Sequence, residues 1–354
     1  MSRRAGPVFI LGVNRSGTSL IAELVYRWGA YGGDPARLSR GNSGNPRGYW
    51  EHEGLHDFLG DLANEVGLLH PSFRECVRQK AQEPLHRQRA LRLIAEMEDG
   101  GTAWFWKDPL LSVMLPFWQE IVERPVYVVA VRNPADVAAS WEEFTLPPGL
   151  PEGIRLTAAS LLRWQHYTLS ILDAVEASAS KLFVAYEDVL ESPEAQCARL
   201  SGFLDEHCGS EGAREGQRLP EMVQAVDASL HRHRSRAAFS QLAEATPEQK
   251  RLYDLLLGKV EDAATPYDAR QLALYAGWRE YLRNLALFSQ LFAEARPILG
   301  SRAVRLLWAL GRPLRGLAGA LRGRQPAGPP QPAGAPLRGD RSEARTSTQP
   351  PEPG

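Results

Sequence analysis

Several features that mark whole classes of protein are scarce in this chain of 354 residues. Its three cysteines, Cys76, Cys197 and Cys208, form no Cys-x-x-Cys pair, which argues against a disulfide scaffold or a structural zinc site and favours a reducing compartment. The formal net charge of −1 gives no general attraction to nucleic acid or anionic membranes. No window holds about 18 or more apolar residues, and no apolar leader precedes the first apolar run, so we expect a cytoplasmic chain without a membrane span.

The chain does contain enough apolar sequence, 44% of its residues, for a substantial core. Short apolar runs predict strands at residues 8–11, 103–107, 125–132 and 182–186. The runs are continuous rather than alternating, which is typical of strands buried on both faces of a parallel sheet. With helical patterns between them, they predict a three-layer α/β fold around a central parallel sheet. Ligands bind such sheets beyond the carboxyl ends of the strands, where Gly12, Lys107, Arg132 and Tyr186 fall.

The composition predicts one domain over residues 1–297, followed by two segments of different character. Helical patterns within it cover residues 18–28, 55–66, parts of 70–100, 135–144, 194–204, 252–260 and 268–295, whereas 205–245 is polar and less regular. Residues 298–325 carry six arginines and no acid, with leucines on one helical face. This segment is either a peripheral membrane-surface helix or a packed or disordered segment. Residues 326–354, with eight prolines and four glycines, are predicted to be disordered.

The most informative stretch joins the first predicted strand to the first helix and reads Gly12-Val13-Asn14-Arg15-Ser16-Gly17-Thr18-Ser19. A strand, a glycine-bounded loop and a helix N-terminus form an anion site, because backbone N–H groups converge where the helix is partially positive. The hydroxyls of Ser16, Thr18 and Ser19 add donors. The glycine spacing matches the nucleotide P-loop, but Thr18 replaces its lysine and the cation comes earlier, as Arg15. The alternative is an ordinary turn with incidental polar residues.

A second stretch, Arg132-Asn133-Pro134-Ala135-Asp136-Val137-Ala138-Ala139-Ser140, follows the clearest predicted strand. Arg132 offers a bidentate charged fork and Ser140 a hydroxyl from the next helix, unless Arg132 is simply a surface arginine at a strand end. The segment Arg15–Ser19 resembles the 5′-phosphosulfate loop, and Arg132–Ser140 the 3′-phosphate motif, of sulfotransferases that use 3′-phosphoadenosine-5′-phosphosulfate (PAPS). The resemblance covers about residues 7–205 and implies a P-loop-like sulfotransferase fold with PAPS as the sulfuryl donor.

The resemblance also implies roles for single residues. Arg15 and Lys107 would contact the transferring sulfuryl group. Tyr186, in Tyr186-Glu187-Asp188, would pack near the adenine, the alternative being a core tyrosine beside a helix cap. The Lys-x-His of cytosolic members is absent here, because the chain reads Lys107-Asp108-Pro109.

The general base is therefore sought elsewhere. The segment Asn45-Pro46-Arg47-Gly48-Tyr49-Trp50-Glu51 resembles the Asn-Pro-x-Gly-Tyr-Phe-Glu segment of bacterial and carbohydrate-type members, which implies Glu51 as the base. His52, Glu53 and Asp108 are the other candidates for the general base. Alternatively, Glu51 only places a charge at a helix N-terminus.

Other functions also fit parts of the sequence. His52-Glu53-Gly54-Leu55-His56 has the H-E-x-x-H spacing of zinc proteases, although Gly54 weakens a helix there. A P-loop kinase or NTPase would use Asp108 or Asp188 for magnesium, and a catalytically silent nucleotide-binding protein would need neither. The sequence is best interpreted as a PAPS-dependent sulfotransferase that needs no metal and sulfates a hydroxyl acceptor, a saccharide or other small metabolite, without a nucleic-acid partner.

Overall fold

The computed structural model describes most of the region in which strands and helices are predicted. It describes residues 6–39, 41, 45, 48–68, 72–100, 103–145, 156–209, 218–227, 229 and 239–267. All of these belong to one structural unit. The helix predicted at 268–295, the arginine-rich segment 298–325, the tail 326–354 and the boundary after residue 297 lie outside the described residues.

A parallel sheet lies at the centre of this unit. Its strands are β1 (Val8–Leu11), β2 (Phe105–Lys107), β3 (Val126–Val131) and β4 (Lys181–Ala185), in the order β2-β1-β3-β4, with every neighbouring pair parallel. The helices are α1 (Thr18–Trp28), η1 (Pro35–Arg37), α2 (Glu53–Val66), α3 (Phe73–Lys80), α4 (Pro84–Glu98), α5 (Leu111–Trp118), α6 (Pro134–Thr145), α7 (Thr157–Val175), α8 (Tyr186–Glu191), α9 (Pro193–Cys208), α10 (Arg218–Ala225), η3 (Phe239–Gln241) and α11 (Pro247–Glu261). The predicted α/β fold is confirmed.

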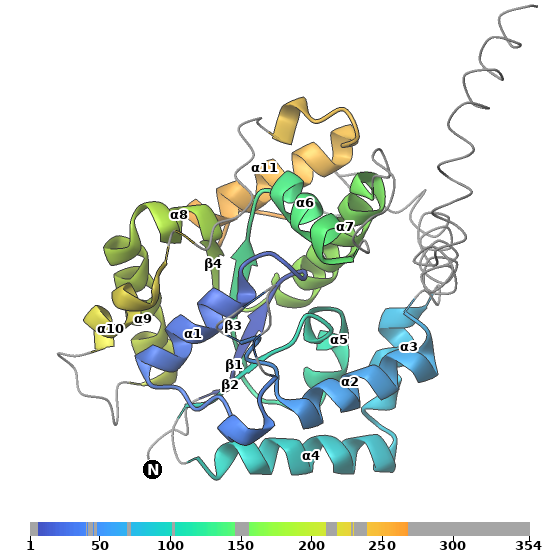
Figure 1. Ribbon diagram of the computed structural model, residues 1–354. Coiled ribbons are helices and arrows are strands. Elements are labelled where there is room, and N and C mark those ends of the chain that lie inside the picture. Colours follow the sequence, from blue (N-terminus) through green and yellow to red (C-terminus); the bar gives the residue numbers. More distant parts are fainter. Residues whose placement is uncertain are drawn as a thin grey trace, which may run out of the picture. The chain divides into compact units, whose positions relative to one another are not determined.

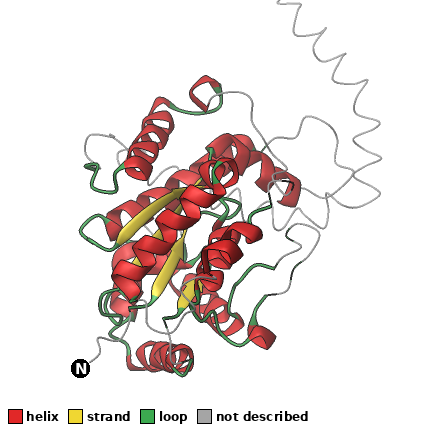
Figure 2. Cartoon of the chain, turned by 90° about the vertical axis from the view of Figure 1, so that its left-hand side faces the viewer, coloured by secondary structure: helices red, strands yellow, loops and turns green. Residues whose placement is uncertain are grey.

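Helices cover both faces of the sheet, which gives the three layers seen in Figures 1 and 2. On β1, Val8 and Ile10 pack among residues of α1, α9 and α10, whereas Phe9 and Leu11 pack among residues of α2, α3, α5 and α7. Both sets are almost fully buried. The strand runs are therefore continuously apolar because each face carries its own layer of helices. No described helix has the length and apolar character that a membrane crossing requires.

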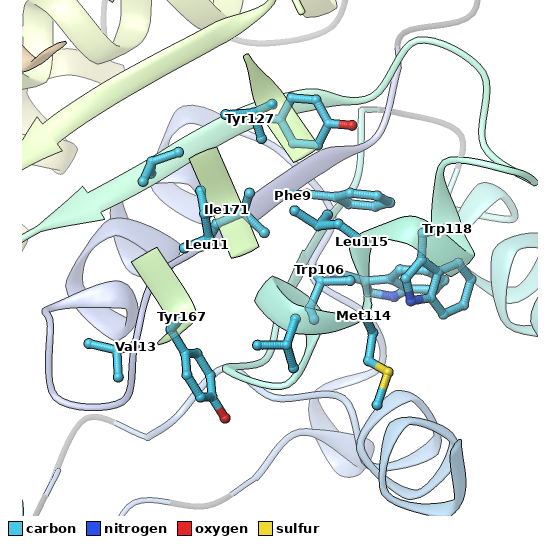
Figure 3. Close-up of a cluster of buried hydrophobic side chains, with 14 of the residues drawn as sticks. Phe9, Leu11, Val13, Trp106, Met114, Leu115, Trp118, Tyr127, Tyr167 and Ile171 are labelled. Atoms are coloured by element: carbon cyan, nitrogen blue, oxygen red, sulfur yellow. The ribbon is translucent and has the colours of Figure 1, made fainter. Parts of the chain in front are cut away.

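Large aromatic side chains fix β2 and α5 against β1 (Figure 3). The rings of Phe9 and Trp106 are stacked with centroids 6.0 Å apart, and Trp106 meets Trp118 edge-on at 4.7 Å. Such pairs contribute about 0.5–1.5 kcal/mol beyond the area that they bury. Because Lys107 and Asp108 follow Trp106 directly, this packing also holds them in place.

Several predicted boundaries are confirmed. Helix α1 covers residues 18–28, with Gly17 before it and Gly29 after it, both at positive φ. Residues 70–100 contain two helices, and Ala90 and Met97 of α4 are fully buried, so α4 also contributes to the core. The expectation of an irregular 205–245 segment missed α10. That helix forms because Met222 and Ala225, one turn apart, are buried against the α1 side of the sheet.

Candidate active site

The carboxyl ends of the parallel strands gather the predicted site residues at one edge of the sheet. Gly12 follows β1, Lys107 is the last residue of β2, and Arg132 follows β3. Tyr186 follows β4 as the first residue of α8, rather than ending the strand as predicted. Since all neighbouring strands are parallel, the predicted common edge is confirmed.

The loop after β1 is held in a fixed turn by its own hydrogen bonds. Both the backbone N–H and the hydroxyl of Ser16 donate to the carbonyl of Val13, at 3.2 and 2.7 Å. The N–H of Gly12 donates to the Ser112 hydroxyl of α5 at 3.0 Å. Arg15 has a φ of 72°, a left-handed conformation that costs a residue with a Cβ about 1–2 kcal/mol. The surrounding bonds hold this strained turn, as is common at ligand sites.

The first turn of α1 completes this loop. The helix begins at Thr18, which is buried, and Ser19 follows it, half-buried. Gly17 precedes the helix at a φ of 93°, so the first N–H groups of α1 point back toward the loop. The strand, loop and helix therefore have the arrangement of an anion site.

The two predicted anion-binding motifs lie against each other. Arg132 Nη1 donates to the carbonyl of Arg15 at 2.8 Å, and Arg15 Nε donates to the Ser140 hydroxyl at 2.9 Å. The Arg132 guanidinium lies 4.6 Å from the centroid of the Tyr186 ring. A Cβ on Gly17 would be only 2.4 Å from Cδ2 of that ring. Segments far apart in the sequence thus form one continuous cluster.

The loops after β3 and β4 are also tied together. The backbone N–H of Asn133 donates to Glu187 Oε1 at 3.0 Å, and burial raises the pKa of Glu187. The Asn133 side chain accepts from the N–H of Ala135 at 2.9 Å, which closes the first turn of α6. Glu187 therefore fixes the loop that carries Arg132, a role that the Tyr-Glu-Asp resemblance did not indicate.

A second group of side chains lies at the end of β2. Lys107 Nζ lies 2.6 Å from Glu51 Oε1, and their side chains are 2% and 16% exposed. The carbonyl of Glu51 accepts from the N–H of Ser39 at 2.8 Å. The preceding residue, Trp50, has a φ of 59° and its ring packs 4.8 Å from that of Tyr26. The structure thus brings together two residues that the sequence predicted separately.

His56 was not predicted as a partner of this group. Its Nδ1 lies 2.8 Å from Oδ2 of Asp108, and this hydrogen bond is the main reason that the pKa of His56 is raised to about 8. Asp108 is 1% exposed and its Oδ1 accepts the N–H of Leu110 at 2.7 Å. The donor atoms of Glu51, His56 and Asp108 lie within 4.8 Å of one another. Lys107 Nζ, 2.6 Å from Glu51 Oε1, borders the same cluster.

The H-E-x-x-H pattern does not form a zinc-protease helix face. Helix α2 begins at Glu53, so His52 is its N-cap, and His52 Nδ1 accepts the N–H of Leu55 at 3.4 Å. His52 Nε2 lies 3.3 Å from Glu96, and burial lowers the pKa of His52. His56 instead contacts Asp108. The two histidines have different partners, and the only motif signal for His56 was a spacing associated with metal binding.

The chain was compared with curated proteins and with solved structures. No curated protein matches the chain. Three solved structures are similar at low identity. The sulfotransferase domain of the Synechococcus PCC 7002 olefin synthase is 16% identical, with 76% of this chain and 98% of that chain covered and a TM-score of 0.40. The sulfotransferase domain of the curacin biosynthetic pathway is 16% identical, with coverages of 80% and 99% and a TM-score of 0.39. Sulfotransferase STF9 from Mycobacterium avium is 14% identical, with coverages of 73% and 77% and a TM-score of 0.41.

The chain also matches the sequence model of one protein family over a long stretch. The model of the sulfotransferase family matches residues 7–208, which include both predicted anion-binding motifs and all four strands. This match spans more than half of the chain. The protein therefore belongs to the sulfotransferase family and is a sulfuryl-transferring enzyme.

Proposed function

We propose that this sulfotransferase takes its sulfuryl group from PAPS and transfers it to a hydroxyl group of a saccharide or other small metabolite. The observation that carries the donor assignment is the direct contact between the two anion-binding motifs, through Arg132 and Arg15 and through Arg15 and Ser140. PAPS carries a phosphosulfate at its 5′ position and a phosphate at its 3′ position. A ligand charged at both ends suits two anion sites that share hydrogen bonds.

Each end of the donor has its own set of groups in this proposal. The loop N–H groups, the start of α1 and the hydroxyls of Ser16, Thr18 and Ser19 bind the 5′-phosphosulfate. Arg132 and Ser140 bind the 3′-phosphate, and Tyr186 packs against the adenine. The position of the Tyr186 ring supports this role, because it lies 4.6 Å from the Arg132 guanidinium and close to Gly17 of the first loop.

The transfer itself is an in-line displacement at sulfur. The acceptor oxygen forms a bond to sulfur while the bond between sulfur and the bridging phosphate oxygen breaks. Negative charge grows on the sulfuryl and leaving oxygens, so catalysis depends mainly on positioned positive groups, as in phosphoryl transfer. Arg15 and Lys107 supply those groups, and loss of one positioned donor costs about 3–4 kcal/mol of barrier. The acceptor proton passes to the cluster around Glu51, the base that the sequence motif predicts.

A P-loop kinase is the main competing function, and one contact argues against it. Both carboxylate oxygens of Asp108 already have partners, since Oδ1 accepts from Leu110 and Oδ2 contacts His56. Asp108 would have to break these bonds to bind a magnesium ion. These contacts disfavour Asp108 as the magnesium ligand of a kinase and leave Asp188 as the other candidate for that role.

Calorimetric titration separates these functions. We expect adenosine 3′,5′-bisphosphate to bind without added metal, and ATP with Mg²⁺ to bind weakly or not at all. Arg15→Ala should lower turnover, whereas Arg27→Ala, at the opposite end of α1 and paired with Glu23, is the matched control. Transfer of labelled sulfate from PAPS to a panel of glycans, lipids and phenols identifies the acceptor class. Magnesium-dependent ATP binding, or bisphosphate binding without any transfer, would contradict the proposal.

A further inference from the structure

Two charged pairs lie side by side at the end of β2. Lys107 and Asp108 are consecutive in the chain, and each contacts a residue near the start of α2. Lys107 donates a hydrogen bond to Glu51, and Asp108 is hydrogen-bonded to His56. The donor atoms of Glu51, His56 and Asp108 lie within 4.8 Å of one another. His56 therefore lies in the same cluster as the residues proposed for catalysis, although no motif assigned it there.

Asp108 determines which nitrogen of His56 is available. The Asp108 carboxylate is buried, and its other oxygen is fixed by the N–H of Leu110. An ionised carboxylate can only accept hydrogen bonds, so the facing Nδ1 of His56 carries a proton. A neutral His56 ring then has its lone pair on Nε2. The His56 side chain is 56% exposed, and within the described part of the chain Nε2 has no hydrogen-bond partner.

Glu51 is placed differently from His56. Its Oε1 lies 2.6 Å from the buried ammonium of Lys107, so this carboxylate is engaged in holding a cation. A residue in that position fixes where the lysine charge lies. The two pairs thus suit two tasks: one orients a positive charge, and the other presents an oriented lone pair to solvent.

We propose, on the basis of the PAPS-dependent transfer proposed above, that His56 Nε2 accepts the proton of the acceptor hydroxyl and that Glu51 acts by positioning Lys107. As the acceptor oxygen bonds to sulfur, its proton moves to Nε2. The bond between sulfur and the bridging oxygen breaks, and its electron pair leaves with adenosine 3′,5′-bisphosphate. The imidazolium, stabilised by Asp108, later releases the proton to water. Asp108 is a positioning residue, because it acts through His56.

The surroundings of His56 predict how the rate depends on pH. Asp108, Glu51 and Asp57 all face His56 with negative charge, and Glu51 is itself paired with Lys107. The pKa of His56 is raised to about 8, chiefly by the Asp108 hydrogen bond. Most molecules then hold a protonated His56 at neutral pH. For an alcohol acceptor, kcat/KM should therefore rise with pH and level off above about pH 8.

The test compares acceptors that do and do not need a base, using the full chain and labelled PAPS. Octyl glucoside and chitotriose keep their hydroxyl protons under the assay conditions. A tyrosine-like phenol has a pKa of about 10, but the electron-withdrawing nitro group makes 4-nitrophenol much more acidic, so it is largely ionised in the assay. His56→Asn keeps a group that can bond to Asp108 but removes the base. We expect it to lower kcat for the alcohols by about 10²–10⁴-fold, with a much smaller loss for 4-nitrophenol. Affinity for adenosine 3′,5′-bisphosphate should not change.

Control variants separate proton transfer from loss of structure. Asp108→Asn should lower kcat and move the pH midpoint down toward the ordinary histidine value, because it removes the main cause of the raised pKa. Asp57→Asn removes an exposed neighbouring charge that makes no hydrogen bond to His56, and should leave kcat within about twofold.

Two kinds of result would overturn the inference. If His56→Asn keeps alcohol sulfation within about threefold while Glu51→Gln abolishes it, Glu51 is the base. Equal losses with 4-nitrophenol and the alcohols would show that His56 has only a structural role. If the wild-type chain binds no adenosine 3′,5′-bisphosphate and transfers no label to any acceptor, the donor assignment itself fails, which is a different outcome from either of these.

Discussion

Replacing Gly17 with alanine should destabilise the protein through two separable effects. The φ of Gly17 is 93°, in the left-handed region that side chains with a Cβ disfavour. A Cβ at this position would also lie 2.4 Å from Cδ2 of Tyr186, far inside van der Waals contact. Tyr186 has little room to move, because it is 9% exposed and lies against the Arg132 guanidinium. The substitution therefore tests whether the two motifs are packed as the structure has them.

The two effects differ in size and in their dependence on Tyr186. The left-handed backbone costs alanine about 1–2 kcal/mol whatever its neighbours are. Forcing extra volume against a buried ring costs about 1–3 kcal/mol more. Only the second cost should disappear when Tyr186 is replaced by alanine. The double-mutant cycle should thus show a coupling energy of about 1–3 kcal/mol between the two positions.

Urea unfolding of the wild type, both single variants and the double variant measures this coupling. The experiments are done without nucleotide, because a bound ligand would add its own stabilisation. Gly202→Ala is the matched control. Gly202 lies in α9, and among the described residues nothing lies within 4 Å of a Cβ placed on it. This control should stabilise the protein by about 0.5–1 kcal/mol, as alanine does in an open helix position.

Two results would refute the reasoning. A loss below about 1 kcal/mol for Gly17→Ala would mean that neither the left-handed turn nor the ring contact is as tight as the structure shows. An equal loss in the Tyr186→Ala background would mean that the contact contributes nothing. In either case the packing of the first loop against Tyr186, on which the proposed donor site depends, would be wrong.

Further predictions concern donor binding, transfer and acid stability. Arg132→Lys removes the planar guanidinium that lies over the Tyr186 ring. It should weaken the binding of adenosine 3′,5′-bisphosphate, measured by calorimetry, by about tenfold or more. An unchanged affinity would argue against the 3′-phosphate assignment. Lys107→Met should lower kcat by about 10²–10³-fold while donor affinity is kept, which steady-state kinetics on the wild type and variant would check. Burial lowers the pKa of His166 to about 4, so the fold should lose up to about 3 kcal/mol as the pH falls from 6.5 toward 4, and unfolding of His166→Gln over that range should show a smaller loss.

The fold could be predicted from the sequence because its signals are local. The run 126–131 is apolar throughout, and such a run is stable only when helices cover both sides of the strand, as they do for β3. The start of α1 was marked by Gly17, whose freedom from a Cβ permits the left-handed residue before the helix. Among the described helices, α5, α7, α8 and α10 were not predicted. Of these, α5, α8 and α10 have only six to eight residues each, too few to produce a clear periodic signal. The 19-residue α7 was not predicted either.

The contacts between motifs could not be predicted in the same way. The first loop and the segment after β3 were each identified from their residue types, yet the hydrogen bond from Arg132 to the carbonyl of Arg15 joins residues 117 apart in sequence. A backbone carbonyl leaves no trace in the residue types. The pairing of Lys107 with Glu51 is non-local too, and Glu51 follows a residue in the left-handed conformation, Trp50. The resemblance to sulfotransferases implied a role for each residue without implying which pairs are in contact.

His52 and His56 show why spacing alone misassigns such residues. Two histidines four apart share a helix face only if both lie within the helix. Helix α2 begins one residue after His52, so that histidine uses its ring to cap the helix while His56, a turn later, extends toward Asp108. The same spacing of two histidines fits a metal site. It fits equally well a first histidine that caps a helix and a second that is hydrogen-bonded to a carboxylate. What separates them is the position of the helix start. Here it directs the side chain of His52 toward Glu96 and that of His56 toward Asp108, within 4.8 Å of a Glu51 carboxylate oxygen.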